Sequence, residues 1–268
     1  MIEAIKQQFA KGMTNEDKLN RAREYIQILS LKILDEKVFF KFMAFTGGSA
    51  LRVIFGVRRF SEDLDFSLIK KGGFSFPEVN EGLVKGLNLA GLQVESKPKV
   101  KNTVFSALLK FPGLLKQLEL SPLESQNLSI KIEVDSNPPK GGSTQNSLIQ
   151  KYYIFNVVHF DLPSMYATKL HACFYRKYVK GRDFYDFIWY MANRAKPNLL
   201  LLNNAIEQTQ GESPKINEQN LKEFLLKGIE RVDFNDARKD VERFLEDKEE
   251  LRLFDAKNIR SSIESIYG

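Results

Sequence analysis

Apolar and polar residues recur along this chain with two different periods. Between residues 15 and 36 the apolar positions follow one another every three or four residues, which predicts an amphipathic helix. The same spacing predicts helices at 49–55 and 78–90. Short apolar or alternating runs predict the strands that lie between them, at 42–46, 63–69, 92–96, 103–111, 128–134 and 152–158.

The pattern changes after Pro163, where helical spacing replaces alternation. Helices are predicted at 164–177, 183–194, 198–208, 217–228, 236–246 and 256–266. The segment 136–147, SNPPKGGSTQNS, consists almost wholly of turn-forming residues and is predicted to be a loop. A mixed first part and a helical second part predict an α+β protein with two domains, residues 1–160 and 161–268.

Composition excludes several classes of protein. The single cysteine, Cys173, excludes a disulfide framework and a cysteine-based zinc site, and two histidines make a histidine-rich metal site improbable. No apolar stretch is long enough to cross a bilayer, and the N-terminus lacks the apolar run of a signal peptide, so a soluble, cytoplasmic protein is expected. The formal charge of +6 permits a polyanionic partner without requiring one.

The candidate chemistry lies between residues 45 and 66. A predicted strand runs into Gly47, Gly48 and Ser49, which open a helix whose first N–H groups suit an anion such as a phosphate. Asp63 and Asp65 follow on the next predicted strand, where residues two apart project from one face. Two adjacent carboxylates favour a divalent cation, and Mg²⁺ prefers such hard oxygen ligands.

A third carboxylate is available on the predicted strand SIKIEVD. Glu133 lies in mid-strand and is the favoured ligand, whereas Asp135 begins the following loop and has turn capping as its simpler explanation. Arg58, Arg59 and Ser61 precede the aspartates on the connecting loop and are candidate phosphate contacts. A Gly-Gly turn or an Asp-x-Asp pair taken singly is ordinary structure; their order along the chain is what favours phosphoryl-transfer chemistry.

A second group of candidates lies on the helices after Pro163. Lys169 and Arg176 occur at i and i+7 on one predicted helix face, together with the small residues Ala172 and Cys173. Asp183 and Asp186 follow one turn apart on the next helix. A solvated basic face is the simpler explanation of the basic residues, and weak helix-surface ion pairs of Arg182 and Asp186 are the simpler explanation of the second helix.

These motifs resemble a known family. Gly-Gly-Ser followed by Asp-Leu-Asp-Phe is similar to the signature of the polymerase-β-like nucleotidyltransferases. The chain also resembles the AbiEii/AbiGii toxins of abortive-infection and type IV toxin–antitoxin systems. The motifs that carry this resemblance are GGSALR, RRFSEDLDF, KLHA and RDFYD. The resemblance covers about residues 42–194. It implies a polymerase-β-like core followed by a helical domain that contributes Lys169 and the RDxxD motif to the active site.

The resemblance also implies a reaction and its participants. The expected activity is a Mg²⁺-dependent transfer of a nucleotide from an NTP to RNA, plausibly a tRNA 3′ end, with a cognate antitoxin encoded nearby. The implied catalytic residues are Asp63, Asp65, Lys169 and Asp183. Two Mg²⁺ ions are expected on Asp63, Asp65 and Glu133. The NTP is expected on Gly47, Gly48, Ser49, Arg59, Ser61, Lys169 and Arg176.

Two other functions use the same residues. One is a binding module that holds nucleotide or RNA without turnover, which loss of some motif residues would favour; none is lost. The other is transfer to a protein or small-molecule acceptor. The Asp-x-Asp motif does not distinguish between acceptors, because surface shape selects them.

Overall fold

The chain forms two compact units that interleave along the sequence. A computed structural model describes residues 1–268, apart from the side chain of residue 253. The sheet unit comprises Met1–Gly56, Phe60–Asn137 and Gln145–His159. The helical unit comprises Val57–Arg59, Pro138–Thr144 and Phe160–Gly268.

The sheet unit is built on a mixed sheet of seven strands in the order β3-β4-β5-β2-β1-β7-β6. The strands are β1 (Met43–Thr46), β2 (Leu64–Leu68), β3 (Pro98–Lys101), β4 (Val104–Phe111), β5 (Leu128–Asp135), β6 (Thr144–Lys151) and β7 (Tyr153–Phe160). The helices are α1 (Ile2–Lys6), α2 (Asn15–Glu36), the 3-10 helix η1 (Phe39–Lys41), α3 (Gly47–Phe55), α4 (Phe76–Leu89) and α5 (Leu114–Gln117). β2 runs parallel to β5 and antiparallel to β1.

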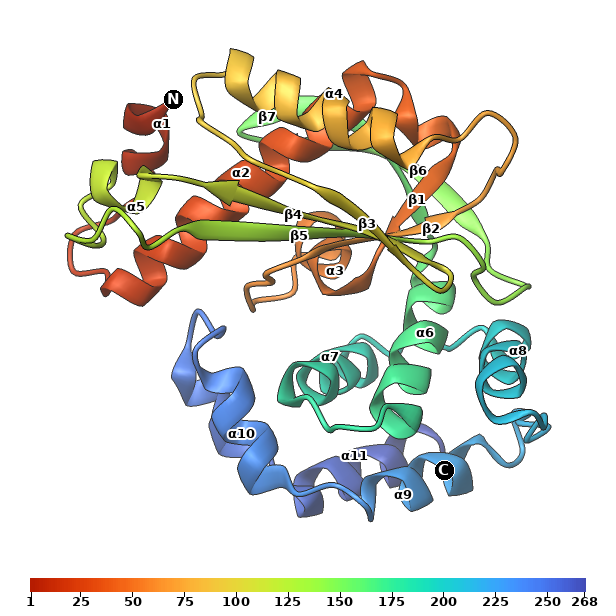
Figure 1. Ribbon diagram of the computed structural model, residues 1–268. Helices are drawn as coiled ribbons and strands as arrows, with labels where there is room; N and C mark the ends of the chain where they lie inside the picture. The colour runs from red at the N-terminus through yellow and green to blue at the C-terminus, as the bar shows by residue number, and fades with distance from the viewer. The chain divides into compact units, whose positions relative to one another are not determined.

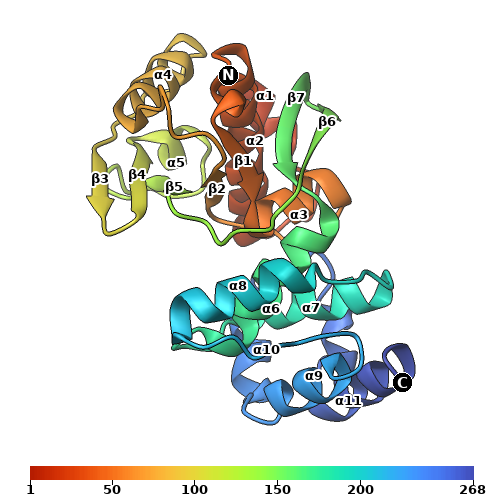
Figure 2. The same ribbon diagram turned by 90° about the vertical axis from the view of Figure 1, so that its right-hand side faces the viewer.

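The sheet has an apolar face and a polar face over β4 and β5, because buried and more exposed residues alternate along these strands. In β5 the residues Leu128, Ile130, Ile132 and Val134 are buried, whereas the residues between them are half-buried and polar. Helix α2 contacts β5, and α4 contacts β3 and β4. These two helices also lie side by side (Figures 1 and 2). Burial of this apolar face supplies the core of the unit.

Helix α3 is fastened to α2 by a buried ion pair. The Glu24 side chain of α2 accepts hydrogen bonds from Arg52 of α3 and from Lys151, the latter at 2.7 Å. Burial opposes ionisation of Glu24, but Arg52 and Lys151 hold its pKa below the ordinary value. Arg52 also lies 4.0 Å above the ring of Phe60. These contacts fix the helix that follows the Gly-Gly turn.

The helical unit packs its helices around an aromatic core. Its elements are α6 (Leu162–Tyr175), α7 (Gly181–Ala192), α8 (Leu199–Gln210), α9 (Leu221–Ile229), α10 (Phe234–Glu242), the 3-10 helix η2 (Lys248–Leu253) and α11 (Ala256–Ile266). Helix α6 packs against α7 and α8, and α7 packs against α10. Tyr166 of α6 and Tyr190 of α7 stack with ring centroids 4.3 Å apart. Figure 2 shows these helices together.

The α+β class predicted from the sequence is confirmed, and some elements differ. The strand predicted at 92–96 is wrong, because this segment makes only one isolated bridge, from Glu95 to Lys110. The loop predicted at 136–147 ends too late, because β6 already begins at Thr144. The strands β3 and β6 and the helices α1 and α5 were not predicted. β3, α1 and α5 are short, and the residues of β3 are all exposed, so no alternation marks that strand. Most residues of β6 are exposed as well.

Candidate functional site

The Gly-Gly turn brings the start of α3 against Asp65. β1 ends at Thr46, and Gly47 takes a φ of +74°, in the left-handed region that favours glycine. A Cβ placed on Gly47 would overlap the carboxylate oxygen Oδ2 of Asp65. Glycine is therefore required here both by the backbone conformation and by the close approach of the aspartate.

The N-terminus of α3 lacks the side-chain cap that several other helices have. Thr46 occupies the N-cap position but makes no capping hydrogen bond. By contrast, α2, α4, α6 and α8 are capped by Thr14, Ser75, Asp161 and Asn198. The Ser49 side chain is 1% exposed, and its hydroxyl has no hydrogen-bond partner among the described residues. Uncapped N–H groups beside an unsatisfied hydroxyl make this end of α3 suitable for an anion.

The candidate carboxylates form a row on the polar face of the sheet. Asp65 of β2 is the direct partner of Glu133 on the parallel strand β5, so the two side chains project from the same face. Asp63 precedes β2 by one residue, and extending the register of Leu64 with Ile132 places it level with Lys131. All three carboxylate residues are half-buried. The spacing predicted from the sequence therefore assembles on two neighbouring strands.

Lys131 supplies a cation at this row. Its ammonium lies 2.7 Å from Oε1 of Glu133. The hydrogen bond to Glu133 raises the pKa of Lys131, and the charges of Asp63 and Asp65 act in the same direction. The lysine thus offsets part of the negative charge that these carboxylates accumulate.

The donors in the row match a divalent cation in kind. Carboxylate oxygens are the ligands that Mg²⁺ prefers, and Asp65 and Glu133 stand on adjacent strands. Among the described residues no three His, Cys, Asp or Glu side chains are gathered closely enough to hold a metal. Glu133 is turned to Lys131 instead. The residues present therefore fit the ion in their chemistry, while in this structure the Glu133 carboxylate is paired with Lys131.

Other candidates from the sequence have structural partners. The Asp135 carboxylate accepts a hydrogen bond from the N–H of Asn137 at 2.9 Å, as a turn cap does. The backbone carbonyl of Ser61 accepts a hydrogen bond from the Gln27 side chain at 3.0 Å. Arg58 is exposed and forms an ion pair with Glu250 at 3.0 Å.

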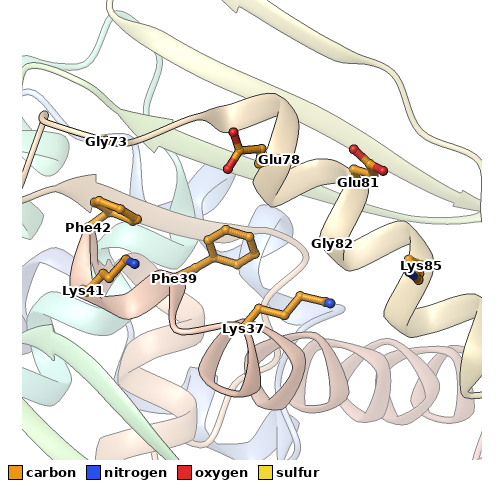
Figure 3. Close-up of a pocket in the computed structure, with 9 residues that line it drawn as sticks. All are labelled: Lys37, Phe39, Lys41, Phe42, Gly73, Glu78, Glu81, Gly82 and Lys85. Atoms are coloured by element: carbon orange, nitrogen blue, oxygen red, sulfur yellow. The ribbon is translucent and has the colours of Figure 1, made fainter.

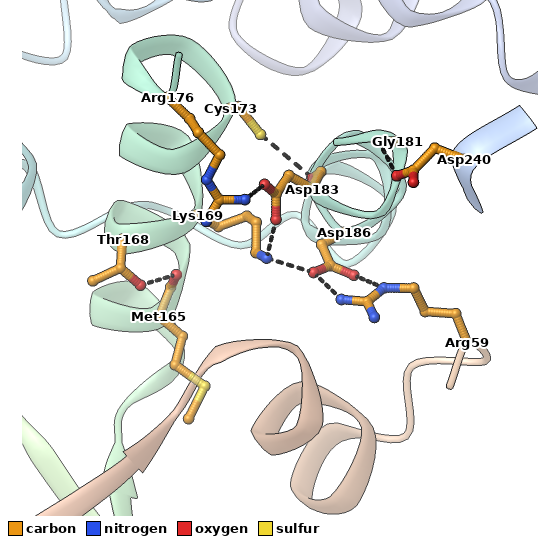
Figure 4. A network of polar contacts seen from close by, with 10 residues as sticks. All are labelled: Arg59, Met165, Thr168, Lys169, Cys173, Arg176, Gly181, Asp183, Asp186 and Asp240. Carbon is orange, nitrogen blue, oxygen red and sulfur yellow. Dashed lines mark hydrogen bonds and ion pairs between the residues drawn. The ribbon is translucent and has the colours of Figure 1, made fainter. Parts of the chain in front are cut away.

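The helical unit holds a buried network of charged residues (Figure 4). Lys169 of α6 lies 2.8 Å from Asp183 and 2.8 Å from Asp186, both of α7. Arg59 binds both oxygens of Asp186, with its Nε donating at 2.6 Å. Arg176 donates to the second oxygen of Asp183. Lys169 is 8% exposed, Arg59 2% and Asp186 0%.

Mutual compensation keeps this network ionised. Burial lowers the pKa of Lys169, but Asp183 and Asp186 outweigh it and raise the pKa above the ordinary value. Burial raises the pKa of Asp183, but Lys169 and Arg176 outweigh it and hold the pKa below the ordinary value. A buried charge without such partners would be very costly.

The network changes the picture of the second group of candidates. Asp186 pairs with Lys169 and Arg59 inside the unit and not with Arg182, whose guanidinium lies 4.2 Å from the ring of Phe244. The partnership of Arg59 with Asp186 spans 127 positions and was missed from the sequence. The basic sequence around Arg59 offered a charge there but no sign of its partner.

A separate hollow of about 500 Å³ lies in the sheet unit, between α4 and the segment that follows α2 (Figure 3). It is lined by Lys37, Phe39, Lys41, Phe42, Gly73, Glu78, Glu81, Gly82 and Lys85. None of the candidate residues from the sequence lines it.

Among the described residues, no helix combines the length and apolar character needed to cross a membrane.

Comparison with known proteins gives one family and two similar folds. The model of the family "Nucleotidyl transferase AbiEii toxin, Type IV TA system" matches residues 30–259. The crystal structure of JHP933 from Helicobacter pylori is 18% identical, with a TM-score of 0.55 over 92% of this chain and 91% of that one. An H. pylori structure proposed to be a nucleotidyltransferase is also 18% identical, with a TM-score of 0.51 over 97% and 96%. No curated protein gives a match.

Proposed function

The chain belongs to the AbiEii family of nucleotidyltransferase toxins of type IV toxin–antitoxin systems. We propose that it transfers a nucleotide from an NTP to RNA and that this reaction requires Mg²⁺. The family model covers the Gly-Gly turn, the carboxylate row and the buried charge network. The activity of a nucleotidyltransferase follows from the family; the metal and the acceptor are the proposal.

One observation carries the proposal: the uncapped start of α3 lies against Asp65, beside Glu133. Gly47 is in close contact with the Asp65 carboxylate, and Asp65 is the register partner of Glu133. A phosphate group on the N–H groups of Gly48 and Ser49 would therefore be next to carboxylates able to share a cation with it. This is the layout that phosphoryl transfer requires.

The side chains of the row have distinct tasks in the proposed reaction. Asp63 and Asp65 would hold Mg²⁺, with Glu133 as the third carboxylate. Bound there, Mg²⁺ would neutralise the triphosphate charge and lower the pKa of the acceptor hydroxyl. The acceptor oxygen bonds to the α-phosphorus, the bond from that phosphorus to the pyrophosphate oxygen breaks, and the acceptor proton passes to solvent. The start of α3 keeps the triphosphate in position during the exchange.

RNA is the proposed acceptor because the chain combines this site with a positive charge of +6 and a pI near 9.1. A tRNA 3′ end is the acceptor that the resemblance implies. A cognate antitoxin is the partner expected for a type IV system. Direct contact between the two is not needed for such an antitoxin to act.

Lys169 and Asp183 keep the catalytic roles that the resemblance gives them as part of the proposal. In the structure they bind each other, together with Asp186 and Arg176. A direct contact with nucleotide requires Lys169 to exchange one of its carboxylate partners for phosphate. Otherwise the network acts by positioning its neighbours.

The test is label transfer from radioactive NTPs to total tRNA with Mg²⁺, by the wild type and the Asp65→Asn variant. We expect Asp65→Asn to lower the rate at least about 100-fold, because a metal ligand contributes several kcal/mol to the transition state. Its thermal unfolding should match that of the wild type, since Asp65 is only half-buried. No transfer by the wild type, or unchanged transfer by Asp65→Asn, contradicts the proposal.

A matched pair of variants on β5 identifies the third carboxylate. We expect Glu133→Gln to lower the rate strongly and Asp135→Asn to leave it nearly unchanged, because Asp135 caps a turn. The reverse result assigns the ligand to Asp135.

A further inference from the structure

The polar face that carries the carboxylate row continues across the sheet to its edge. Asp65 is the partner of Glu133, Glu133 of Ser106 on β4, and Ser106 of Lys99 on β3. Residues that face each other on neighbouring strands project from the same side of a sheet. Lys99 therefore shares a face with Asp65, three strand spacings or about 14 Å away.

Lys99 is the middle member of a lysine row along the edge strand. Lys97 and Lys101 stand two positions before and after it, so all three project from this face at intervals of about 7 Å. All three are exposed. None of them forms an ion pair or a side-chain hydrogen bond that the structure gives. Glu95 lies on the same face beyond Lys97, where it pairs through the backbone with Lys110.

The lysine row differs from the other basic residues near candidate sites. Lys131 is bound to Glu133, and Lys169 and Arg176 are bound to Asp183. Lysines that neutralise phosphates displace the counterions condensed on the nucleic acid, and this release drives binding. A lysine already paired with a carboxylate must first give up that partner. Among the described residues, Lys97, Lys99 and Lys101 have no such partner, and they lie on the face of Asp63 and Asp65.

We infer that Lys97, Lys99 and Lys101 bind the phosphate backbone of the RNA acceptor, upstream of the end that receives the nucleotide. The identification of the RNA as the acceptor rests on the proposed function. The position of the binding surface rests on the register of the sheet. Three ammonium groups spaced about 7 Å apart match successive phosphates of a single strand. Contacts to phosphate carry no base preference, so this surface binds RNA independently of sequence.

A simpler role for the same lysines is protection of an exposed sheet edge. Charged residues, and lysine above all, prevent edge strands from pairing with other chains. Such a role predicts aggregation when the lysines are lost and no change in RNA affinity. The two roles thus give different results in one experiment.

The experiment measures binding of a 5′-fluorescein-labelled single-stranded RNA by anisotropy, without NTP, at 50 to 200 mM salt. The test variant is Lys97→Gln/Lys99→Gln/Lys101→Gln. The matched control is Lys37→Gln/Lys41→Gln/Lys85→Gln, which removes the same charge from the hollow in Figure 3, also in the sheet unit. Thermal unfolding establishes that both variants are folded, since all six lysines are exposed.

We expect the test variant to bind RNA about 10- to 100-fold more weakly than the wild type at 0.1 M salt. The slope of log affinity against log salt should fall by about 2, which is 0.7 for each of three phosphate contacts. The control should bind as the wild type does. Binding by the test variant within about twofold of the wild type, equal weakening in the control, or no binding by the wild type overturns the inference.

Two further measurements separate this inference from the proposed function and from an acidic protein partner. Asp65→Asn should bind the RNA as tightly as the wild type, because it lies outside the lysine row. If the wild type transfers no nucleotide but loss of the lysine row still weakens RNA binding, the proposed function is wrong and the assignment of the RNA-binding surface is retained. Polyglutamate that competes as well as RNA of equal charge indicates a protein partner and overturns the assignment to RNA.

Discussion

The two groups of charged residues that the motifs identify are organised in opposite ways. In the sheet unit, Asp63, Asp65 and Glu133 are half-buried, and Lys131 forms an ion pair with Glu133. In the helical unit, Asp183 and Asp186 are buried and bound to Lys169, Arg59 and Arg176. The carboxylates of the first group are therefore partly accessible to solvent. Those of the second group are buried and paired with cations inside the unit.

This difference suits the two groups to different tasks, ligand binding for the first and positioning of the helices for the second. The proposed nucleotide site contains polar groups without protein partners, namely the Ser49 hydroxyl and the uncapped start of α3. A network in which every carboxylate has two cationic partners fixes the relative positions of α6, α7 and the Arg59 segment. Substitutions should therefore reduce stability much more in the second group than in the first.

The largest expected effect is the loss of stability in Asp186→Asn. The substitution leaves Arg59 and Lys169 buried with one carboxylate fewer, and breaking a buried ion pair in this way costs about 3–5 kcal/mol. Urea unfolding followed by circular dichroism measures the change in the free energy of unfolding. Asp65→Asn is the matched control, with an expected change below about 1 kcal/mol. Equal effects of the two substitutions would remove the distinction between the groups.

A smaller effect is expected from acid. The pKa of Asp183 lies below its ordinary value of 3.8 in the folded protein. The stabilisation from its ionised form is therefore complete above the unfolded pKa and is lost as the pH falls through the folded pKa. Below pH 4 the free energy of unfolding should decline by up to about 1.4 kcal/mol per pH unit for this group.

The measurement is a series of urea unfolding curves between pH 2.5 and pH 6. Asp183→Asn should have a lower stability at pH 6 and a flatter decline below pH 4 than the wild type, because it lacks the titrating group. A variant whose decline is as steep as that of the wild type would show that Asp183 is not the group responsible.

Sequence patterns were sufficient for the elements with strong periodicity, including the two strands that carry Asp65 and Glu133. The helix predicted at 15–36 is α2 at the same bounds, and that at 256–266 is α11. The alternation in DLDF and SIKIEVD placed both carboxylate strands correctly. Local spacing decides these features, so the sequence contains them.

Features that depend on distant partners were not predictable in the same way. Nothing near Arg59 indicates that its partner is Asp186, because the fold alone brings them together. The strand β3 could not be predicted from alternation either, because Pro-Lys-Val-Lys has no buried face. Only its pairing with β4 identifies it as a strand. The sequence does not show that the lysine row lies on the same face as the carboxylates. The strand register shows it, because Lys99 is the partner of Ser106 and Ser106 is the partner of Glu133.

The smallest expected effect compares two buried serines at the third position of a helix. Ser49 of α3 has no partner for its hydroxyl among the described residues. Ser164 of α6 accepts hydrogen bonds from the N–H of Ser143 at 3.0 Å and from Asn198 at 3.3 Å. Ser164→Ala should cost about 1 kcal/mol, because it removes the acceptor of two partly buried hydrogen bonds. Ser49→Ala should leave stability unchanged or raise it by about 1 kcal/mol, because an unsatisfied hydroxyl is removed.

Activity should reverse that order. Ser49→Ala removes a donor for the triphosphate and should raise the KM for NTP about 10-fold, the loss of about 1.4 kcal/mol of binding. Ser164→Ala should leave the KM of the folded protein unchanged. Unfolding curves and initial rates at varied NTP concentration measure both quantities on the same samples. A Ser49→Ala variant that is destabilised and retains the wild-type KM would assign Ser49 to packing, and the start of α3 would lose its hydroxyl contact with nucleotide.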